Sequence, residues 1–215
     1  MALMLRIVVL CSAGAGTGSA AATAPRASSE LFGVSAPFGE SVPRFEAAAC
    51  PKTPHPIAAL KTAHCGYLVV PEDRAHPDGR TIRNAVAILP ARSKNPKPDP
   101  VVFMTGGPGA AAILDIPFLV DAGINRNREL IVMAQRGTLY DKPDLYCPEL
   151  DHFYARQVSM VFDSPSTGAK QAAAARACHD RLVERGTEPA AYNTTENAAD
   201  FADLRQALGI KEWNV

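Results

Sequence analysis

Two short, wholly apolar runs, each followed at once by a glycine-containing loop, constrain the fold of this chain more than any other feature. Val101–Met104 and Leu130–Met133 carry no polar side chain, a pattern typical of strands buried on both faces of a parallel sheet. Between them Ala110–Ala122 can form a helix, which Pro117 is expected to kink or split. Strand, loop, helix and strand in this order predict a βαβ unit. We therefore expect an α/β fold with a mostly parallel sheet flanked by helices.

Further elements are indicated on both sides of this unit. Tyr67–Val70 is a short β-prone run and Thr81–Leu89 alternates apolar with polar residues, so the turn signals between them predict a β-hairpin. Two helices are expected at Ala169–Arg185 and Thr195–Leu208, and each is followed by a glycine that ends it. The second helix is expected to be capped by Thr194 or by its own first residue.

The N-terminal segment has the pattern of an export signal. Residues 1–24 combine a positive charge, the apolar run Ile7–Cys11 and the Ala-x-Ala site Ala20–Ala22, which predicts a secretory signal peptide. A disordered leader rich in Ala and Gly is the competing interpretation. Residues 25–64 show no sustained period and are expected to form an irregular N-terminal arm, which leaves 65–215 for the folded domain. These features predict a secreted or periplasmic protein.

The cysteine count supports export. Loss of the signal leaves four of the five cysteines, and an even number in an exported chain favours disulfides over free thiols. Three pairings are possible, and we expect Cys50 with Cys65 and Cys147 with Cys178 because each pair is local. Closing the shorter loop, 15 positions long, would contribute about 3 kcal/mol. A zinc site is the competing interpretation, but no C-x-x-C spacing occurs, so we expect no metal and no cofactor.

The charge balance limits the classes of partner. The chain has 22 basic and 22 acidic residues among 215, so there is no electrostatic reason to expect nucleic acid or an anionic membrane as a partner. The apolar run near the N-terminus is too short to span a bilayer. We therefore expect no membrane contact after signal removal. The oligomeric state is left open.

The glycine-rich loop Thr105–Gly109 is the first candidate for chemistry. It starts at the carboxyl end of a buried run, where α/β sheets place their ligand crevices. Its glycines let the backbone approach a substrate and aim a free N–H at a developing oxyanion, whereas Pro108 lacks an N–H and stiffens the loop. A tight strand-to-helix turn without a ligand is the alternative. A phosphate-binding loop does not fit, because no Lys-Ser/Thr follows and the spacing is not G-x-G-x-x-G.

A second candidate, Gln135–Thr138, follows the second buried run. Arg136 can bond loop carbonyls or the glycine-rich loop and hold it in shape, and Gln135 and Gly137 would support it. A solvated arginine in a turn is the alternative. No H-E-x-x-H motif occurs, so the sequence does not support a zinc peptidase.

Several motifs stand in a definite order along the chain. They are Cys65–Asp73, Gly106–Gly109, Gln135–Thr138, Cys147–Glu149, Asp200–Gly209 and Trp213-Asn214. Together they closely resemble the proline iminopeptidase and secreted tripeptidyl aminopeptidase group of α/β-hydrolases, over roughly Cys50 to Val215. Ordered motifs at sensible separations are far more specific than any one of them.

The resemblance implies roles for the glycine-rich loop. In that family the loop supplies one N–H of the oxyanion hole, a role that falls on Gly107, with Gly106 and Gly109 shaping the turn. One departure is Thr105, where the family often has His. A second is the alanine before Gln135, where the family often has Asp, which removes a possible carboxylate partner for Arg136.

The resemblance also places the nucleophile later in the chain. In the family a Trp-Asn strand leads within a few residues to a G-x-S-x-G elbow, and Ile210–Val215 begins such a strand. The only look-alike, Gly33–Pro37, lacks the final Gly. All five histidines precede this point, whereas the acid and His should follow the serine. We therefore expect the N-terminal half of the fold, truncated before the nucleophile elbow, with no nucleophile, acid or His of a triad.

The leading hypothesis is an exported serine hydrolase that releases residues from peptide N-termini. This chain would carry its oxyanion loop, take a peptide as substrate only within the full-length enzyme, and be inactive alone. A non-catalytic exported binding domain is the alternative from another class. An esterase or amidase of the same fold is the third hypothesis.

Overall fold

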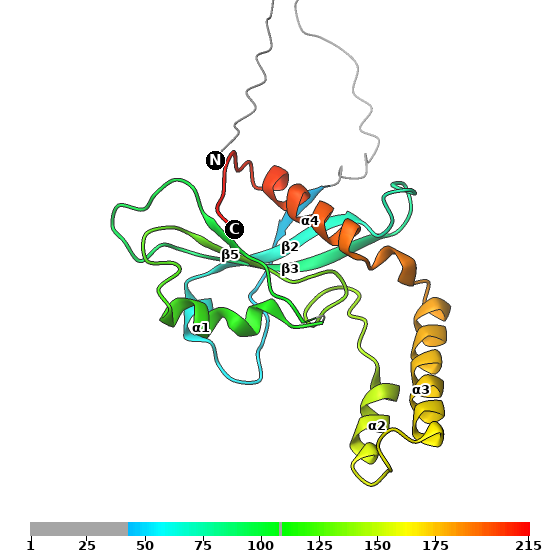
Figure 1. The fold of residues 1–215 in the computed structure, drawn as a ribbon. Helices are drawn as coiled ribbons and strands as arrows, with labels where there is room; N and C mark the ends of the chain where they lie inside the picture. The colour runs from blue at the N-terminus through cyan, green and yellow to red at the C-terminus, as the bar shows by residue number, and fades with distance from the viewer. Residues whose placement is uncertain (1–42, 108) are drawn as a thin grey trace, which may run out of the picture. The chain divides into compact units, whose positions relative to one another are not determined.

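The computed structural model describes residues 43–107 and 109–215, which are coloured in Figure 1. The chain divides into two units, Met1–Phe38 and Gly39–Val215, and all elements described below belong to the second. The predicted signal peptide, the first part of the predicted arm and Pro108 lie outside the described residues. Among the helices of the described part, none combines the length and the hydropathy needed to cross a bilayer.

A five-stranded sheet of mixed direction organises this unit. Its strands lie in the order β1-β2-β3-β5-β4. The first three neighbouring pairs are antiparallel, and β4 and β5 are parallel. The strands are β1 (Arg44–Ala47), β2 (His64–Pro71), β3 (Thr81–Leu89), β4 (Val101–Phe103) and β5 (Leu130–Met133).

The α/β class is confirmed, but the prediction of a mostly parallel sheet is wrong for the described strands. The short connection between β2 and β3 lets them pair antiparallel, whereas β4 and β5 are parallel because a helical crossover separates them. The bounds of β3 and β5 are those predicted, while β2 is longer than the predicted run. The strand β1 falls inside the segment expected to be irregular.

Glycine at one position of β2 explains how β1 packs there. A Cβ on Gly66 would lie 2.4 Å from the carbonyl oxygen of Glu46 and 2.5 Å from Cζ of Phe45. The missing side chain therefore leaves room for the Phe45 ring across β2. The Cys50–Cys65 disulfide then ties the segment after β1 to the neighbouring position of β2.

Different helices cover the two faces of the sheet. Successive side chains of a strand point to opposite faces. Leu130 and Val132 of β5 share a buried cluster with side chains of α1 (Ile116–Asp121), and the other two residues of β5 share a second cluster with α4 (Thr194–Ala207). Figure 1 shows these two helices on opposite sides of the sheet. The unit therefore has a helix, sheet, helix layering around β4 and β5.

The connection from β4 to β5 is split as Pro117 predicted. A 3₁₀ turn, η2 (Ala112–Asp115), precedes α1, and Pro117 occupies one of the first positions of α1. A proline is tolerated there because the backbone N–H it lacks would have no helical partner.

Helices α2 (Pro148–Gln157) and α3 (Pro165–Glu184) form a helical hairpin, side by side in Figure 1. The Cys147–Cys178 disulfide joins them, so both disulfides have the pairing expected from the sequence. Two disulfides indicate an oxidising compartment such as the cell exterior or periplasm. The sequence did not indicate α2, in which Phe153 alone is buried.

The last helix and the C-terminal residues differ in detail from expectation. The cap of α4 is Asn193, whose side chain accepts from the N–H of Glu196, so the predicted threonine cap is wrong. The strand expected at Ile210–Val215 is a single parallel bridge between Asn214 and Val101. The backbone of Asn214 makes two 2.8 Å hydrogen bonds there, to Val102 and Pro100. The C-terminal residues thus lie along the outer edge of β4.

Candidate functional site

The glycine-rich loop Thr105–Gly109 leaves the carboxyl end of β4 and is held at its first residue. The hydroxyl of Thr105 donates to Oδ2 of Asp115 at 2.8 Å. The carbonyl oxygen of Thr105 accepts from Nε2 of Gln135 at 2.6 Å. The loop is therefore anchored to the turn before α1 and to the loop after β5. The side chain of Thr105 itself makes the first of these bonds.

The backbone of Gly107 has a conformation that other residues rarely adopt. Its φ is +142°, and a Cβ there would lie 3.0 Å from the nitrogen of Ala110. A Cβ on Gly106 would meet no atom within 4 Å. Within the described part of the chain, the N–H of Gly107 donates to no acceptor. That N–H is available to a ligand, as an oxyanion donor has to be.

The loop after β5 packs against the glycine-rich loop through Gln135 and turns sharply at Gly137. Gly137 has a φ of +79°, and a Cβ there would lie 2.7 Å from Cγ of Leu145 and 2.8 Å from Cδ1 of Tyr192. Only glycine fits this position without displacing those side chains.

Arg136 is a buried structural residue, and the alternative of a solvated arginine is wrong. Its Nε and Nη2 donate to the two carboxylate oxygens of Asp200 at 2.8 and 2.7 Å, the bidentate geometry that arginine favours. Its Nη1 donates to the carbonyl oxygens of Glu72 and Ala191, each at 2.7 Å. In the residues described, Arg136 makes no bond to the glycine-rich loop. Asp200 supplies the carboxylate that Ala134 does not.

A second arginine extends this ion-pair network. Nη2 of Arg74 donates to Asp200 at 2.7 Å and to Asp203 at 2.5 Å, and Nη1 pairs with Glu196. Burial opposes the charge, but the hydrogen bonds that Arg74 donates to Asp203 and Asp200 raise the pKa of Arg74. The amide of Asn84 on β3 donates to Asp200 at 2.8 Å. The network therefore joins α4 to β3, to the loop after β2 and to the loop after β5.

Two further groups, the buried Asp141 and the half-buried Tyr192, lie beside the loop after β5. The carboxylate of Asp141 accepts from the N–H of Ala85 at 2.7 Å and of Thr138 at 3.1 Å. Burial raises the pKa of Asp141 well above its ordinary range. The hydroxyl of Tyr192 donates to Glu72 at 2.6 Å. Burial raises the pKa of Tyr192, and the hydrogen bond with Glu72 raises it further.

A cavity of about 440 Å³ opens beside these loops. Its wall includes the backbone of Gly109 and Gly137 and the side chains of Gln135, Tyr192 and Asn197. Among the described residues of the wall, the one charged group is the guanidinium of Arg136, which is already paired with a carboxylate. The described part of the wall is therefore a mixture of polar and apolar groups without an unpaired charge.

Among the described residues, hydrogen-bond donors line this region. Across residues 43–107 and 109–215, no serine hydroxyl is hydrogen-bonded to a histidine. The backbone N–H of Gly107 is a donor that these loops leave without an acceptor among the residues the structure describes.

Sequence reasoning named Gln135, Arg136 and Gly137 and placed Asp200 in a motif, but it did not pair Asp200 with Arg136. A signal was present. Glu196, Asp200 and Asp203 recur at helical spacing and put three carboxylates on one face of α4, a pattern that calls for cationic partners.

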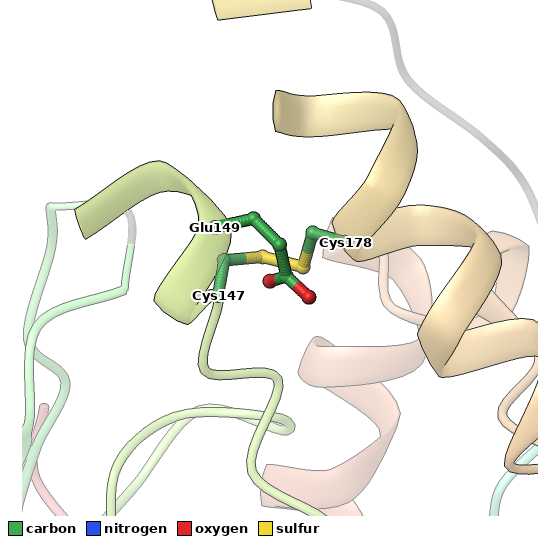
Figure 2. A group of neighbouring side chains, drawn as sticks. All are labelled: Cys147, Glu149 and Cys178. Carbon is green, nitrogen blue, oxygen red and sulfur yellow. A yellow bond between two sulfur atoms is a disulfide. The ribbon is translucent and has the colours of Figure 1, made fainter. Parts of the chain in front are cut away.

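A cluster of metal-type ligands lies on the helical hairpin (Figure 2). It consists of Cys147, Glu149 and Cys178. The two sulfur atoms are bonded to each other, and the carboxylate of Glu149 is bound by Arg181 at 2.6 and 3.0 Å. The hydrogen bond from Arg181 lowers the pKa of Glu149 to about 2. With its ligand atoms occupied in this way, the cluster joins two helices.

Comparison with known proteins gives one group of relatives. No protein-family model matches the chain. It is similar to the tripeptidyl aminopeptidase of Streptomyces coelicolor, with 28% identity over 162 residues, and to that of Streptomyces lividans, with 29% over 163 residues. Each alignment covers 72% of this chain and 30% of the relative, so the aligned part spans less than a third of those proteins. The similarity supports a peptidase-type function.

Proposed function

We propose that this chain is the N-terminal part of an exported serine hydrolase of the α/β-hydrolase fold that releases residues from the N-termini of peptides. The position of the glycine-rich loop at the carboxyl end of β4 supports a role in binding the carbonyl oxygen of a substrate. The similarity to two tripeptidyl aminopeptidases supports a peptide as the substrate. The two disulfides support function outside the cytoplasm.

The observation that carries the proposal is the free N–H of Gly107 on an anchored loop at the end of a parallel strand. In acyl transfer, negative charge develops on the carbonyl oxygen as the tetrahedral intermediate forms, and a preorganised N–H stabilises it. Thr105 is fixed on two sides, by Asp115 and by Gln135. The loop can then keep its shape while the charge develops.

The serine, the histidine and the acid are contributed in this proposal by polypeptide that this chain does not contain. The relatives support this, because the alignments cover only 30% of their length. The position of Asn214 beside β4 also supports it. A strand that continued there parallel to β4 would bring the residues that follow to the carboxyl end of β4, where Gly107 lies. The chain alone is inactive on this proposal.

The test uses the protein purified from the cells that export it. Its intact mass shows whether further polypeptide is joined to this chain, and a fluorophosphonate probe shows whether it holds an activated serine. Labelling together with release of a fluorophore from a tripeptide substrate with a free N-terminus supports the proposal. Absence of labelling in a protein whose intact mass equals that of this chain without its predicted signal peptide would favour the non-catalytic binding domain. Preference for an N-acetylated substrate would favour an esterase or amidase.

A matched pair of variants tests the role of the loop. Gly107→Ala places a Cβ 3.0 Å from the nitrogen of Ala110 and strains the backbone, so it moves the N–H. Loss of an oxyanion donor lowers kcat by roughly 10²–10³, and we expect a loss approaching this with little change in KM. Gly106→Ala has open space and is the control. Equal kcat values for the two variants would remove Gly107 from the mechanism.

A further inference from the structure

The helical hairpin has a cavity of its own, of about 620 Å³, lined by residues of α2, α3 and the turn between them. Its apolar lining residues, which we call the floor, are Phe153, Met160, Ala173 and Ala174, and its polar ones, which we call the rim, are Glu149, His152, Arg156 and Lys170. A cavity of this size holds one or two side chains of a ligand. We call it the hairpin groove.

The rim of the hairpin groove is positively charged. Glu149 lines the groove, but its carboxylate is already bound by Arg181. Arg156 and Lys170 line it as well, and neither side chain has an ion pair or hydrogen bond with another residue of the described part. Two cations above an apolar floor are complementary to an apolar group that carries a negative charge.

Apolar surface continues from the groove onto the turn between the helices. Val158, Val161 and Phe162 are 92%, 75% and 76% exposed, and they flank Met160 of the groove in the sequence. Soluble proteins seldom expose large apolar side chains in such a group unless the surface binds a partner. The groove and the turn together present a longer surface than one small molecule would cover.

We propose that the hairpin groove binds the C-terminal residue of a peptide that ends in an apolar side chain. The side chain lies on the floor beside Phe153, and the terminal carboxylate accepts hydrogen bonds from Arg156 and Lys170. The preceding residues cross Val161 and Phe162. A C-terminal residue fits because it alone in a peptide carries an apolar side chain and a carboxylate on the same Cα, as the short step from floor to rim requires. Arginine suits a carboxylate through its planar pair of donors.

This binding does not depend on the proposed hydrolase activity and is tested on the intact, disulfide-bonded protein as it is purified from the cells that export it. Amide chemical shifts are followed by NMR during titration with N-acetyl-Ala-Ala-Phe, whose blocked N-terminus resists an aminopeptidase. We expect shifts confined to α2, α3 and their turn. The same peptide with a C-terminal amide lacks the charge and should bind about tenfold more weakly, since each of two exposed ion pairs is worth up to ~1 kcal/mol. Equal affinity for the acid and the amide would overturn the proposal.

Substitutions separate the groove from general charge effects. Arg156→Gln and Lys170→Gln should each weaken binding about three- to fivefold. Arg176→Gln removes a cation of α3, the helix of Lys170, that does not line the groove, and it should leave the affinity unchanged. An equal loss of affinity in this variant would contradict the assignment. Ala173→Leu fills the groove and should abolish binding, with circular dichroism confirming that the helices remain.

A final comparison separates a peptide from a small apolar carboxylate. Phe162→Ser should weaken binding of the tripeptide but not of 3-phenylpropionate, which reaches only the floor and rim. If 3-phenylpropionate binds as tightly as the tripeptide and Phe162→Ser affects neither ligand, the peptide assignment is wrong.

Discussion

Replacing Asp200 with alanine should destabilise the second unit by about 3 kcal/mol. The side chain of Asp200 is completely buried, and its oxygens accept from Arg136 at 2.8 and 2.7 Å, from Arg74 at 2.7 Å and from Asn84 at 2.8 Å. Removing one partner of a buried ion pair costs about 3–5 kcal/mol, because the other charge remains buried. Arg136 keeps two carbonyl acceptors, which places the expected loss at the lower end of that range.

The assay is urea unfolding of the oxidised chain, followed by far-UV circular dichroism and by fluorescence of the single tryptophan. Asp203→Ala is the matched control, because Asp203 lies on the same helix and also binds Arg74, but its side chain is 23% exposed. Exposed pairs contribute about 1 kcal/mol or less. If Asp200→Ala leaves too little folded protein, Asp200→Asn keeps the shape and should show a smaller, measurable loss.

The reasoning fails if Asp200→Ala costs no more than Asp203→Ala. That result would mean that the guanidinium of Arg136 is satisfied by the carbonyl oxygens and by water without its carboxylate. The buried network would then be a consequence of the fold and not a contributor to its stability.

Two further perturbations have defined outcomes. Gly137→Ala should cost about 1–3 kcal/mol in urea unfolding, because its Cβ would meet Leu145 and Tyr192 at 2.7 and 2.8 Å and its φ is unfavourable for alanine; an unchanged midpoint would contradict the packing. The pKa of Glu149 is lowered to about 2 by Arg181, so its stabilisation is present above the unfolded pKa near 4.5 and is lost as pH falls from there toward 2. Protection factors of the amides in α2 and α3, corrected for the intrinsic pH dependence of exchange, should therefore fall over that window, and Glu149→Gln should remove this fall. A Glu149 carboxyl that titrates near 4.5 by NMR would refute the assignment.

Local pattern was sufficient for most of the individual elements. The bounds of β3 and β5 follow from residue alternation and from an unbroken apolar run. Pro117 predicted the split before α1, and the pairing of both disulfides followed from sequence distance. These features depend on backbone preferences and on short loops, which neighbouring residues determine. By contrast, α2 is largely exposed, so it left no apolar period to recognise.

The sequence by itself determined the α/β class, the two glycine-containing loops after β4 and β5, and the residues that occupy them. Only the tertiary structure decided which partners those residues take. Arg136 finds its carboxylate 64 positions away on α4, and the first residue of the glycine-rich loop is bound 30 positions away by Gln135. The tertiary structure also decided which strands of the sheet pair antiparallel. Such contacts depend on the packing of whole elements against one another, and the periodicity of one segment carries no record of which distant segment will face it.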